Sequence, residues 1–193
     1  GPNNFPFAYN AIAGGDFASA IAARNPVIAK GHPSQPATTK RLAELALQAV
    51  QTTGLPSATV QLLYQLENDV GLELVSHPAI GAVGFTGSRR GGLALKAAAD
   101  AAGNPIYLEM SSVNPVIMLA GALHDYTKLA QEFAGSCTLG GGQFCTNPGL
   151  ILLAPSPHAE DFIAAASQHF ANTPNHVLLN EGVLMGLERS VQT

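Results

Sequence analysis

Short apolar runs alternate with amphipathic stretches along most of this chain. Six runs have the length of buried strands: 26–30, 58–63, 80–85, 105–109, 115–119 and 150–153. Stretches with helical spacing separate most of them, and the clearest stripe is Leu42, Leu45, Ala46, Ala49 and Val50. A helix between two strands returns the chain to the edge at which the first strand began, so the strands can pair in parallel. The sequence therefore predicts an α/β fold built from parallel βαβ units.

The composition supports a closely packed fold and argues against several kinds of partner. Only 11% of the residues are charged and 47% are hydrophobic, which argues against disorder and leaves apolar surface to meet more protein. The net charge of −4 and the lack of a basic run argue against nucleic acid as a partner. No apolar run approaches the ~20 residues that span a membrane. The two cysteines imply no disulfide framework, and we expect a cytoplasmic protein.

The segment 140–149, Gly-Gly-Gly-Gln-Phe-Cys-Thr-Asn-Pro-Gly, has the composition of a loop. Six of its ten residues are Gly, Pro or Asn, which hold backbone conformations that other residues resist. Cys145 lies in the middle, where backbone N–H groups can stabilise a thiolate and the oxyanion that it creates. This segment alone supports equally well a small cysteine packed beside a tight turn. Cys137, in the helical run before the loop, is expected to serve packing.

A strand, a turn and a helix over 80–102 form a candidate phosphate site. Gly87 and Ser88 follow the strand and precede a helix expected over 93–102. In open α/β sheets, ligands bind at the carboxyl ends of the strands, where helix N-termini present unpaired N–H groups. The spacing matches neither G-x-G-x-x-G nor a Walker loop. A helix start that needs glycine for close packing is therefore the better-supported interpretation of this motif alone.

Lys30 and Glu109 each end an apolar strand. A lysine at this place usually marks the exit to solvent, and the functional alternative is a contact with a ribose or phosphate at the same edge. A carboxylate in the long apolar stretch around Glu109 is costly unless it is solvated or paired, and a solvated cleft carboxylate suits a general base. An ordinary surface carboxylate is about equally supported.

Other catalytic chemistries have little support in the sequence. The six histidines show no H-E-x-x-H pattern and the cysteines no C-x-x-C pairing, so no metal site is expected. The G-x-S-x-G elbow of serine hydrolases and the G-x-x-x-x-G-K-[ST] loop of nucleotide triphosphatases are both lacking.

Four motifs, taken in order, resemble the aldehyde dehydrogenase superfamily. They are Asn4-Phe5-Pro6 followed by Lys30, Phe85-Thr86-Gly87-Ser88, Glu109 before Asn114-Pro115, and Gly142-Gln143-Phe144-Cys145. Segments 30–33 and 143–149 are most similar to the NADP-preferring branch with α-ketoglutaric semialdehyde (2,5-dioxopentanoate) dehydrogenases and related fatty-aldehyde enzymes. The resemblance implies a parallel βαβ layered fold. Residues 1–109 would be part of a Rossmann-like dinucleotide-binding domain, and residues 110–193 the N-terminal part of the catalytic (thiol) domain.

The resemblance also implies catalytic roles. Cys145 would attack the aldehyde carbonyl and form a thiohemiacetal, with the Asn4 side chain and the Cys145 backbone N–H as the oxyanion hole. After hydride transfer to the nicotinamide, Glu109 would activate the water that hydrolyses the thioester.

The cofactor contacts follow from the same resemblance. Lys30 would hold the adenosine ribose region, and Gly87 and Ser88 the pyrophosphate. Many NAD-dependent members carry Glu three residues after this lysine, whereas Pro33 stands there in this chain and leaves no carboxylate to repel a 2′-phosphate. We therefore expect NADP rather than NAD. The usual Glu-Leu-Gly-Gly motif reads Glu-Met-Ser-Ser at 109–112.

The leading hypothesis is an internal piece of an NADP-preferring, homo-oligomeric aldehyde dehydrogenase whose substrate is an α-keto semialdehyde such as 2,5-dioxopentanoate. A piece is expected because the chain begins at Gly1 without methionine and ends at Thr193 without a closing element. One rival is a non-catalytic remnant that binds nucleotide weakly or serves only in association with other chains. A second rival is a member that forms an acyl phosphate or acyl-CoA and does not need Glu109.

Overall fold

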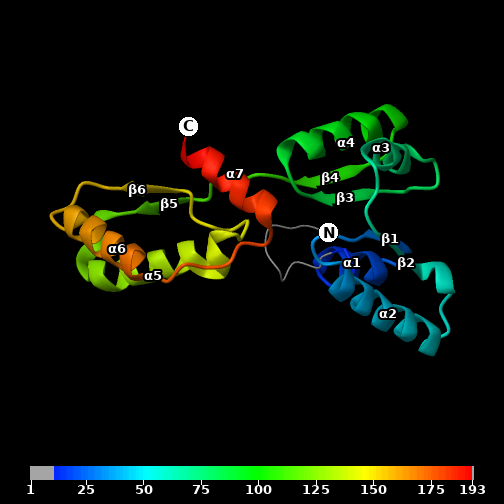
Figure 1. Cartoon of the computed structure of the whole chain (residues 1–193), viewed down its shortest axis with the longest axis horizontal. Helices are drawn as coiled ribbons and strands as arrows, with labels where there is room; N and C mark the ends of the chain where they lie inside the picture. Colours follow the sequence, from blue (N-terminus) through cyan, green and yellow to red (C-terminus); the bar gives the residue numbers. More distant parts are fainter. Residues whose placement is uncertain (1–10, 193) are drawn as a thin grey trace. The chain divides into compact units, whose positions relative to one another are not determined.

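The computed structural model describes residues 11–192 and divides the chain into two compact units, Gly1–Ser111 and Ser112–Thr193. In the described residues the six strands form three parallel pairs, and helical structure connects the two strands of each pair (Figure 1). The α/β class and the parallel βαβ units are therefore confirmed. The division falls two residues after the predicted boundary at 109, and the functional names of the two parts stay predictions.

The first βαβ element lies at the start of the described chain. Strand β1 (Val27–Lys30) pairs with β2 (Val60–Leu63) through helix α2 (Pro36–Thr52), α1 (Gly15–Ala22) precedes β1, and a 3₁₀ turn (Ser57–Thr59) leads into β2. Small and β-branched side chains form its core, because they let helices lie close to the strands. The buried members are Ile12, Ala29, Val50 and Val60.

Helix α2 begins at a proline, six residues before Leu42, the first residue of its apolar stripe. Its first residue is Pro36, which suits that position because the N–H that proline lacks would have no partner inside the helix. Thr39 is buried within the first turn, and its Oγ1 donates to the carbonyl oxygen of Gln35 at 2.8 Å.

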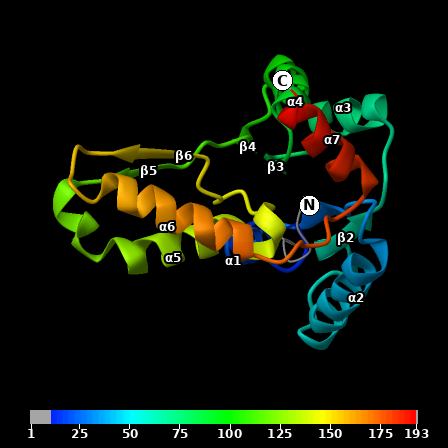
Figure 2. The ribbon, with the colours of Figure 1, turned by 60° about the vertical axis from the view of Figure 1, so that its left-hand side comes forward.

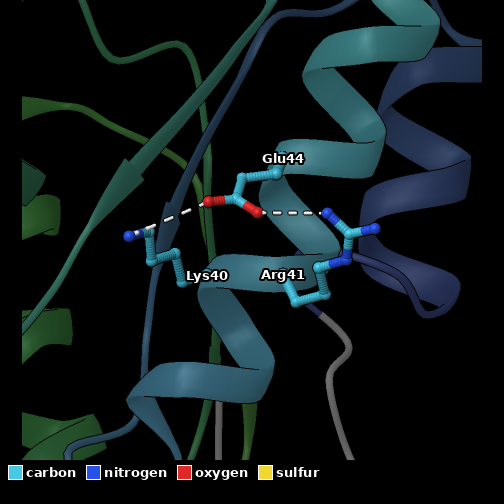
Figure 3. Close-up of polar contacts among 3 residues, drawn as sticks. All are labelled: Lys40, Arg41 and Glu44. Carbon is cyan, nitrogen blue, oxygen red and sulfur yellow. Dashed lines mark hydrogen bonds and ion pairs between the residues drawn. The ribbon is translucent and has the colours of Figure 1, made fainter.

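The solvent face of α2 carries a small group of ion pairs. Lys40 Nζ lies 3.8 Å from one carboxylate oxygen of Glu44, and Arg41 Nη1 lies 3.3 Å from the other (Figure 3). All three side chains are exposed, so these pairs add little to stability.

The second βαβ element precedes Ser111. It contains α3 (Asn68–Ser76), β3 (Val83–Thr86), α4 (Arg89–Ala102) and β4 (Ile106–Glu109). The Asn104 side-chain amide, just before β4, donates to the carbonyl oxygen of Val75 in α3 at 2.8 Å. In the register of the strand pair, Thr86 lies opposite Glu109. The carboxyl ends of β3 and β4 therefore meet at one edge.

Helix α4 begins four residues earlier than expected, at Arg89. Ser88 caps it, since its Oγ accepts a hydrogen bond from the N–H of Gly91 at 3.2 Å. A Cβ on Gly92 would lie 2.8 Å from the Met110 sulfur, so this glycine lets the first turn of the helix pack closely. Close packing, the better-supported interpretation of this motif taken alone, is thus part of its role.

The second unit holds the remaining elements. They are β5 (Pro115–Met118), a 3₁₀ helix (Ala120–Asp125), α5 (Tyr126–Thr138), a 3₁₀ turn (Leu139–Gly142), β6 (Leu150–Leu153), α6 (Ala159–Asn172) and α7 (Glu181–Val191). Helices α5 and α6 lie side by side on one side of the β5–β6 pair (Figure 1, Figure 2). The core between these helices and the strands consists of Met118, Leu123, Ala130, Phe162 and Ala166.

Helix α7 lies in the segment after Asn172, which is not among the predicted helices. Asn180 caps it, accepting a hydrogen bond from the N–H of Val183 at 2.9 Å on its side-chain oxygen. None of the α7 residues that the structure describes is buried, although Val183, Leu184, Leu187 and Val191 have the spacing of an apolar helix face. In the part of the chain that the structure describes, no helix is both long and apolar enough to cross a membrane.

Candidate active site

Three consecutive glycines carry the chain from the end of α5 into the loop of Cys145. Gly140, Gly141 and Gly142 have φ values of 61°, 70° and 72°, in the left-handed region that other residues resist. A Cβ on Gly140 would lie 2.5 Å from the Phe144 ring. The left-handed path and the close approach of the ring therefore both require glycine here.

Gln143 belongs to this loop, its side chain is buried, and both ends of its amide form hydrogen bonds. Its Nε2 donates to the carbonyl oxygen of Gly140 at 2.9 Å, and its Oε1 accepts from the N–H of Leu179 at 2.9 Å. Asn147 closes the loop onto the end of α5, since its Nδ2 donates to the carbonyl oxygen of Cys137 at 2.6 Å. These two amides hold the loop in one shape around Cys145.

The Cys145 side chain is exposed, and the peptide groups on both sides of this residue are held. The carbonyl oxygen of Phe144 accepts from the N–H of Asn147 at 3.1 Å. The carbonyl oxygen of Cys145 accepts from Ser112 Oγ and from Asn114 Nδ2, each at 2.7 Å. Among residues 11–192 the Cys145 N–H has no acceptor, so it is available to a ligand.

The strand register brings these segments together. Pro115 lies opposite Leu150 at the start of the parallel pair β5–β6, so the residues before each strand run alongside one another. The N–H of Gly149 donates to the carbonyl oxygen of Val113 at 2.8 Å. Asn114 has φ 49°, a left-handed conformation that asparagine tolerates better than most residues. Cys145 therefore lies beyond the amino end of the β5–β6 pair.

Cys137, the second cysteine, is half-buried in α5. Burial raises the pKa of its thiol, because desolvation disfavours the thiolate. Its Sγ lies 3.8 Å from the carbonyl oxygen of Pro148. Cys137 has the surroundings of a packing residue, and both cysteines are free.

Lys30, Pro33 and their neighbours form a turn at the carboxyl end of β1. The N–H of Gly31 donates to the carbonyl oxygen of Leu63 at 2.8 Å, which continues the β1–β2 ladder by one residue. Burial lowers the pKa of the Lys30 amine. Burial and, less strongly, the Lys30 charge lower the pKa of His32. Pro33 is exposed on this turn.

Gly87, Ser88 and Glu109 lie at the shared carboxyl edge of β3 and β4. The N–H of Gly87 donates to the carbonyl oxygen of Glu109 at 3.0 Å. The Glu109 side chain is exposed, as a solvated carboxylate would be. Ser88 is also exposed, at the N-terminus of α4. The structure thus brings the predicted pyrophosphate residues and the predicted base to one edge of the first unit.

Two predictions concern what the described residues do not contain. Asn4, the predicted second donor of the oxyanion hole, lies outside the described residues. Between residues 11 and 192, no group of three or more His, Cys, Asp and Glu side chains could hold a metal ion.

Four polar residues around Cys145 were not assigned roles from the sequence: Ser112, Asn114, Gln143 and Asn147. The available signal was local, namely an asparagine directly before proline at 114 and again at 147. Such a residue favours a turn or an extended backbone, but this preference does not identify the carbonyl group that its side chain binds.

The chain matches known proteins along nearly all of its length. Residues 1–186 match the family described as Aldehyde dehydrogenase family. The chain is similar to alpha-ketoglutaric semialdehyde dehydrogenase 2 of Azospirillum brasilense, with 46% identity over 186 residues, 95% of this chain and 35% of that protein. It is also similar to alpha-ketoglutaric semialdehyde dehydrogenase of Acinetobacter baylyi, with 39% identity over 194 residues, 99% of this chain and 36% of that protein.

Solved structures show the same likeness. A mutant of aldehyde dehydrogenase C from Pseudomonas syringae, in complex with NAD+ and octanal, superposes with a TM-score of 0.65 and 25% identity, over 81% of this chain and 31% of that chain. The chain spans about a third of the length of the two curated relatives. Because the family match covers residues 1–186 of 193, the chain belongs to the aldehyde dehydrogenase family.

Proposed function

We propose that the protein oxidises an aldehyde to a carboxylic acid with NAD(P)+, through a covalent intermediate on Cys145. The observation that carries this proposal is an exposed thiol on a loop whose flanking peptide groups are both held by hydrogen bonds. A nucleophile held in this way needs little reorganisation before it reacts. Membership of the aldehyde dehydrogenase family supports the same reaction.

The first step of the proposed mechanism takes place at Cys145. Its thiolate attacks the aldehyde carbon, and the carbonyl π electrons move to the oxygen, which becomes the oxyanion of a thiohemiacetal. The Cys145 backbone N–H, which has no acceptor among residues 11–192, donates to this oxyanion. The Asn4 side chain is proposed as the second donor.

The later steps need a hydride acceptor and a base. Bound NAD(P)+ supplies the hydride acceptor, and loss of hydride converts the thiohemiacetal into a thioester on Cys145. Glu109 is proposed to take a proton from the water that attacks this thioester, and the Cys145 thiolate then leaves. In balance, aldehyde, water and NAD(P)+ give carboxylic acid, NAD(P)H and one proton.

Lys30, Gly87, Ser88 and Pro33 are proposed as the cofactor contacts in the first unit. The residues fit a dinucleotide in two respects. The first turn of α4, which begins after Ser88, contains no acidic residue that would repel a pyrophosphate. The turn over 30–35 contains no carboxylate that would repel a 2′-phosphate, which favours NADP. On this proposal, residues 1–109 bind the dinucleotide and residues 110–193 carry the thiol.

The proposed substrate is an α-keto semialdehyde such as 2,5-dioxopentanoate. Two curated relatives are alpha-ketoglutaric semialdehyde dehydrogenases, at 46% and 39% identity, and they support this substrate class. A homo-oligomeric state and a cytoplasmic location belong to the same proposal.

The test combines substrate turnover with detection of the acyl-enzyme. The purified protein is incubated with 2,5-dioxopentanoate and other aldehydes, with NADP+ or NAD+, and the NAD(P)H formed is measured. Cys145→Ala should abolish turnover and the thioester adduct seen by mass spectrometry, whereas Cys137→Ala should retain both. Unchanged turnover of Cys145→Ala would exclude the mechanism, and dependence on added phosphate or coenzyme A would indicate acyl transfer instead of hydrolysis.

A further inference from the structure

We propose that Ser112 is a positioning residue for the oxyanion hole, acting with Asn114 on the carbonyl group of Cys145. This inference rests on the proposed function of Cys145. Ser112 Oγ donates to the Cys145 carbonyl oxygen at 2.7 Å, from 33 residues away in the sequence. Ser112 and Cys145 both belong to the second unit, in which the β5–β6 register sets their approach.

The backbone of Cys145 is held on both sides. Each peptide group is planar, so a bond to the carbonyl oxygen of Phe144 also sets the direction of the Cys145 N–H. A bond to the carbonyl oxygen of Cys145 restrains the following peptide plane. Together the two bonds limit rotation about φ and ψ of Cys145. The two bonds therefore control the angle between the Cys145 thiol and the Cys145 N–H. Both groups must face the same carbonyl group of the substrate.

Asn114 alone cannot supply all the bonds that this turn requires. Its Nδ2 lies within hydrogen-bond distance of three acceptors: the carbonyl oxygens of Cys145 (2.7 Å) and Asn147 (2.9 Å), and Ser112 Oγ (3.2 Å). An amide nitrogen has only two hydrogens. The Ser112 hydroxyl gives the Cys145 carbonyl a donor of its own, so this carbonyl stays bonded even where an Asn114 hydrogen is shared with another acceptor.

Ser112 is exposed, so its substitution should leave the fold intact while it releases one bond on the Cys145 carbonyl. We expect kcat of Ser112→Ala to fall about tenfold, which corresponds to about 1.4 kcal/mol and is within the range of one hydrogen bond. The KM values for aldehyde and cofactor should change less than about twofold, because ground-state binding does not depend on the oxyanion.

The experiment uses the purified protein and four variants. Ser112→Thr keeps the hydroxyl and should retain most of the kcat of the unsubstituted protein. Ser112→Val has nearly the same shape as the threonine variant but no hydroxyl, so it should behave like Ser112→Ala. Ser111→Ala is the matched control, because Ser111 is exposed and its hydroxyl makes no hydrogen bond among residues 11–192. Iodoacetamide alkylation of Cys145, followed by mass spectrometry, should proceed at similar rates in all of them, since the thiol stays exposed.

Two outcomes would overturn the positioning role: equal kcat for Ser112→Ala and Ser111→Ala, or equal kcat for the Thr and Val variants. A general loss of folding would lower the thermal unfolding temperature and raise the alkylation of Cys137, which separates it from a positioning effect. Cys145→Ala is measured alongside. If Cys145→Ala is inactive and Ser112 has no effect, the proposed function stands and this inference is wrong.

Discussion

The side-chain oxygen Oε1 of Gln143 accepts a hydrogen bond from the backbone N–H of Leu179 at 2.9 Å, across 36 residues of sequence. The other end of the same amide donates to the carbonyl oxygen of Gly140. Gln143 is only 7% exposed, so water cannot readily replace either bond. One buried amide thus connects the loop of Cys145 with the segment that precedes α7.

We expect Gln143→Ala to lower the free energy of unfolding by about 1–3 kcal/mol, because it leaves the Leu179 N–H and the Gly140 carbonyl group without their partner. Urea denaturation measures the change, and hydrogen exchange at Leu179 should become faster. Gln131→Ala is the control. Gln131 is exposed on α5, and its loss should change stability by no more than about 0.5 kcal/mol. Similar effects at both positions would contradict the role of Gln143.

Gly140→Ala should destabilise the loop by about 1–3 kcal/mol, because alanine resists φ 61° and its Cβ would meet the Phe144 ring. Gly135→Ala is the comparison variant, and it should change stability in the opposite direction. Gly135 lies inside α5, where an added Cβ would meet nothing within 4 Å, so alanine should stabilise the helix by about 0.5–1 kcal/mol. Thermal unfolding of both variants gives the comparison, and a stabilising Gly140→Ala would show that the left-handed turn is not required.

Ser88 has a structural role as the cap of α4 and a proposed role at the pyrophosphate, and two substitutions separate them. Ser88→Asn and Ser88→Asp should both keep the cap and the unfolding temperature, since both side chains are good N-caps. Only Ser88→Asp adds a negative charge, and it should raise the KM for NADP+ more than about tenfold. Equal KM values for the two variants would argue against a pyrophosphate near Ser88.

Pro33→Glu should shift the cofactor preference from NADP+ toward NAD+. The new carboxylate would stand on the exposed turn after Lys30, where it would repel a 2′-phosphate and lower kcat/KM with NADP+ by at least about tenfold. Ala37→Glu, at an exposed position in the first turn of α2, adds the same charge and should leave the preference unchanged. If both variants shift the preference equally, the effect is one of net charge and not of a contact at Pro33.

The pKa of Cys137 predicts a pH dependence of stability. Burial raises it, so the folded state holds the thiol proton more tightly than the unfolded state. The contribution of the protonated Cys137 thiol to the free energy of unfolding is fully present below pH 9.0, the ordinary pKa of a thiol. It is lost as the pH rises through the pKa of the folded state. Stability of the unsubstituted protein should therefore fall more steeply above pH 9.0 than that of Cys137→Ala, as urea titrations at several pH values would show. Parallel curves would refute this.

Much of the fold could be predicted from local sequence patterns. The apolar run that ends at Lys30 is β1, and the one that ends at Glu109 is β4. Strand β1 pairs in parallel with β2 and β4 with β3, as the helices between the strands of each pair predict. Errors arose where one polar side chain sets a helix end. Ser88 starts α4 four residues earlier than expected, and Asn180 starts α7, a helix that was not predicted although Val183 and Leu187 have helical spacing.

The environment of Cys145 shows the limit of local patterns. The glycines at 140–142 indicate a left-handed turn, because that preference belongs to each residue and its neighbours. The contacts of Cys145 with Ser112 and Asn114, and of Gln143 with Leu179, join residues 31 to 36 positions apart. They depend on the register of β5 against β6 and on where the chain returns after α6. Long-range packing sets both, and no spacing in the sequence encodes them.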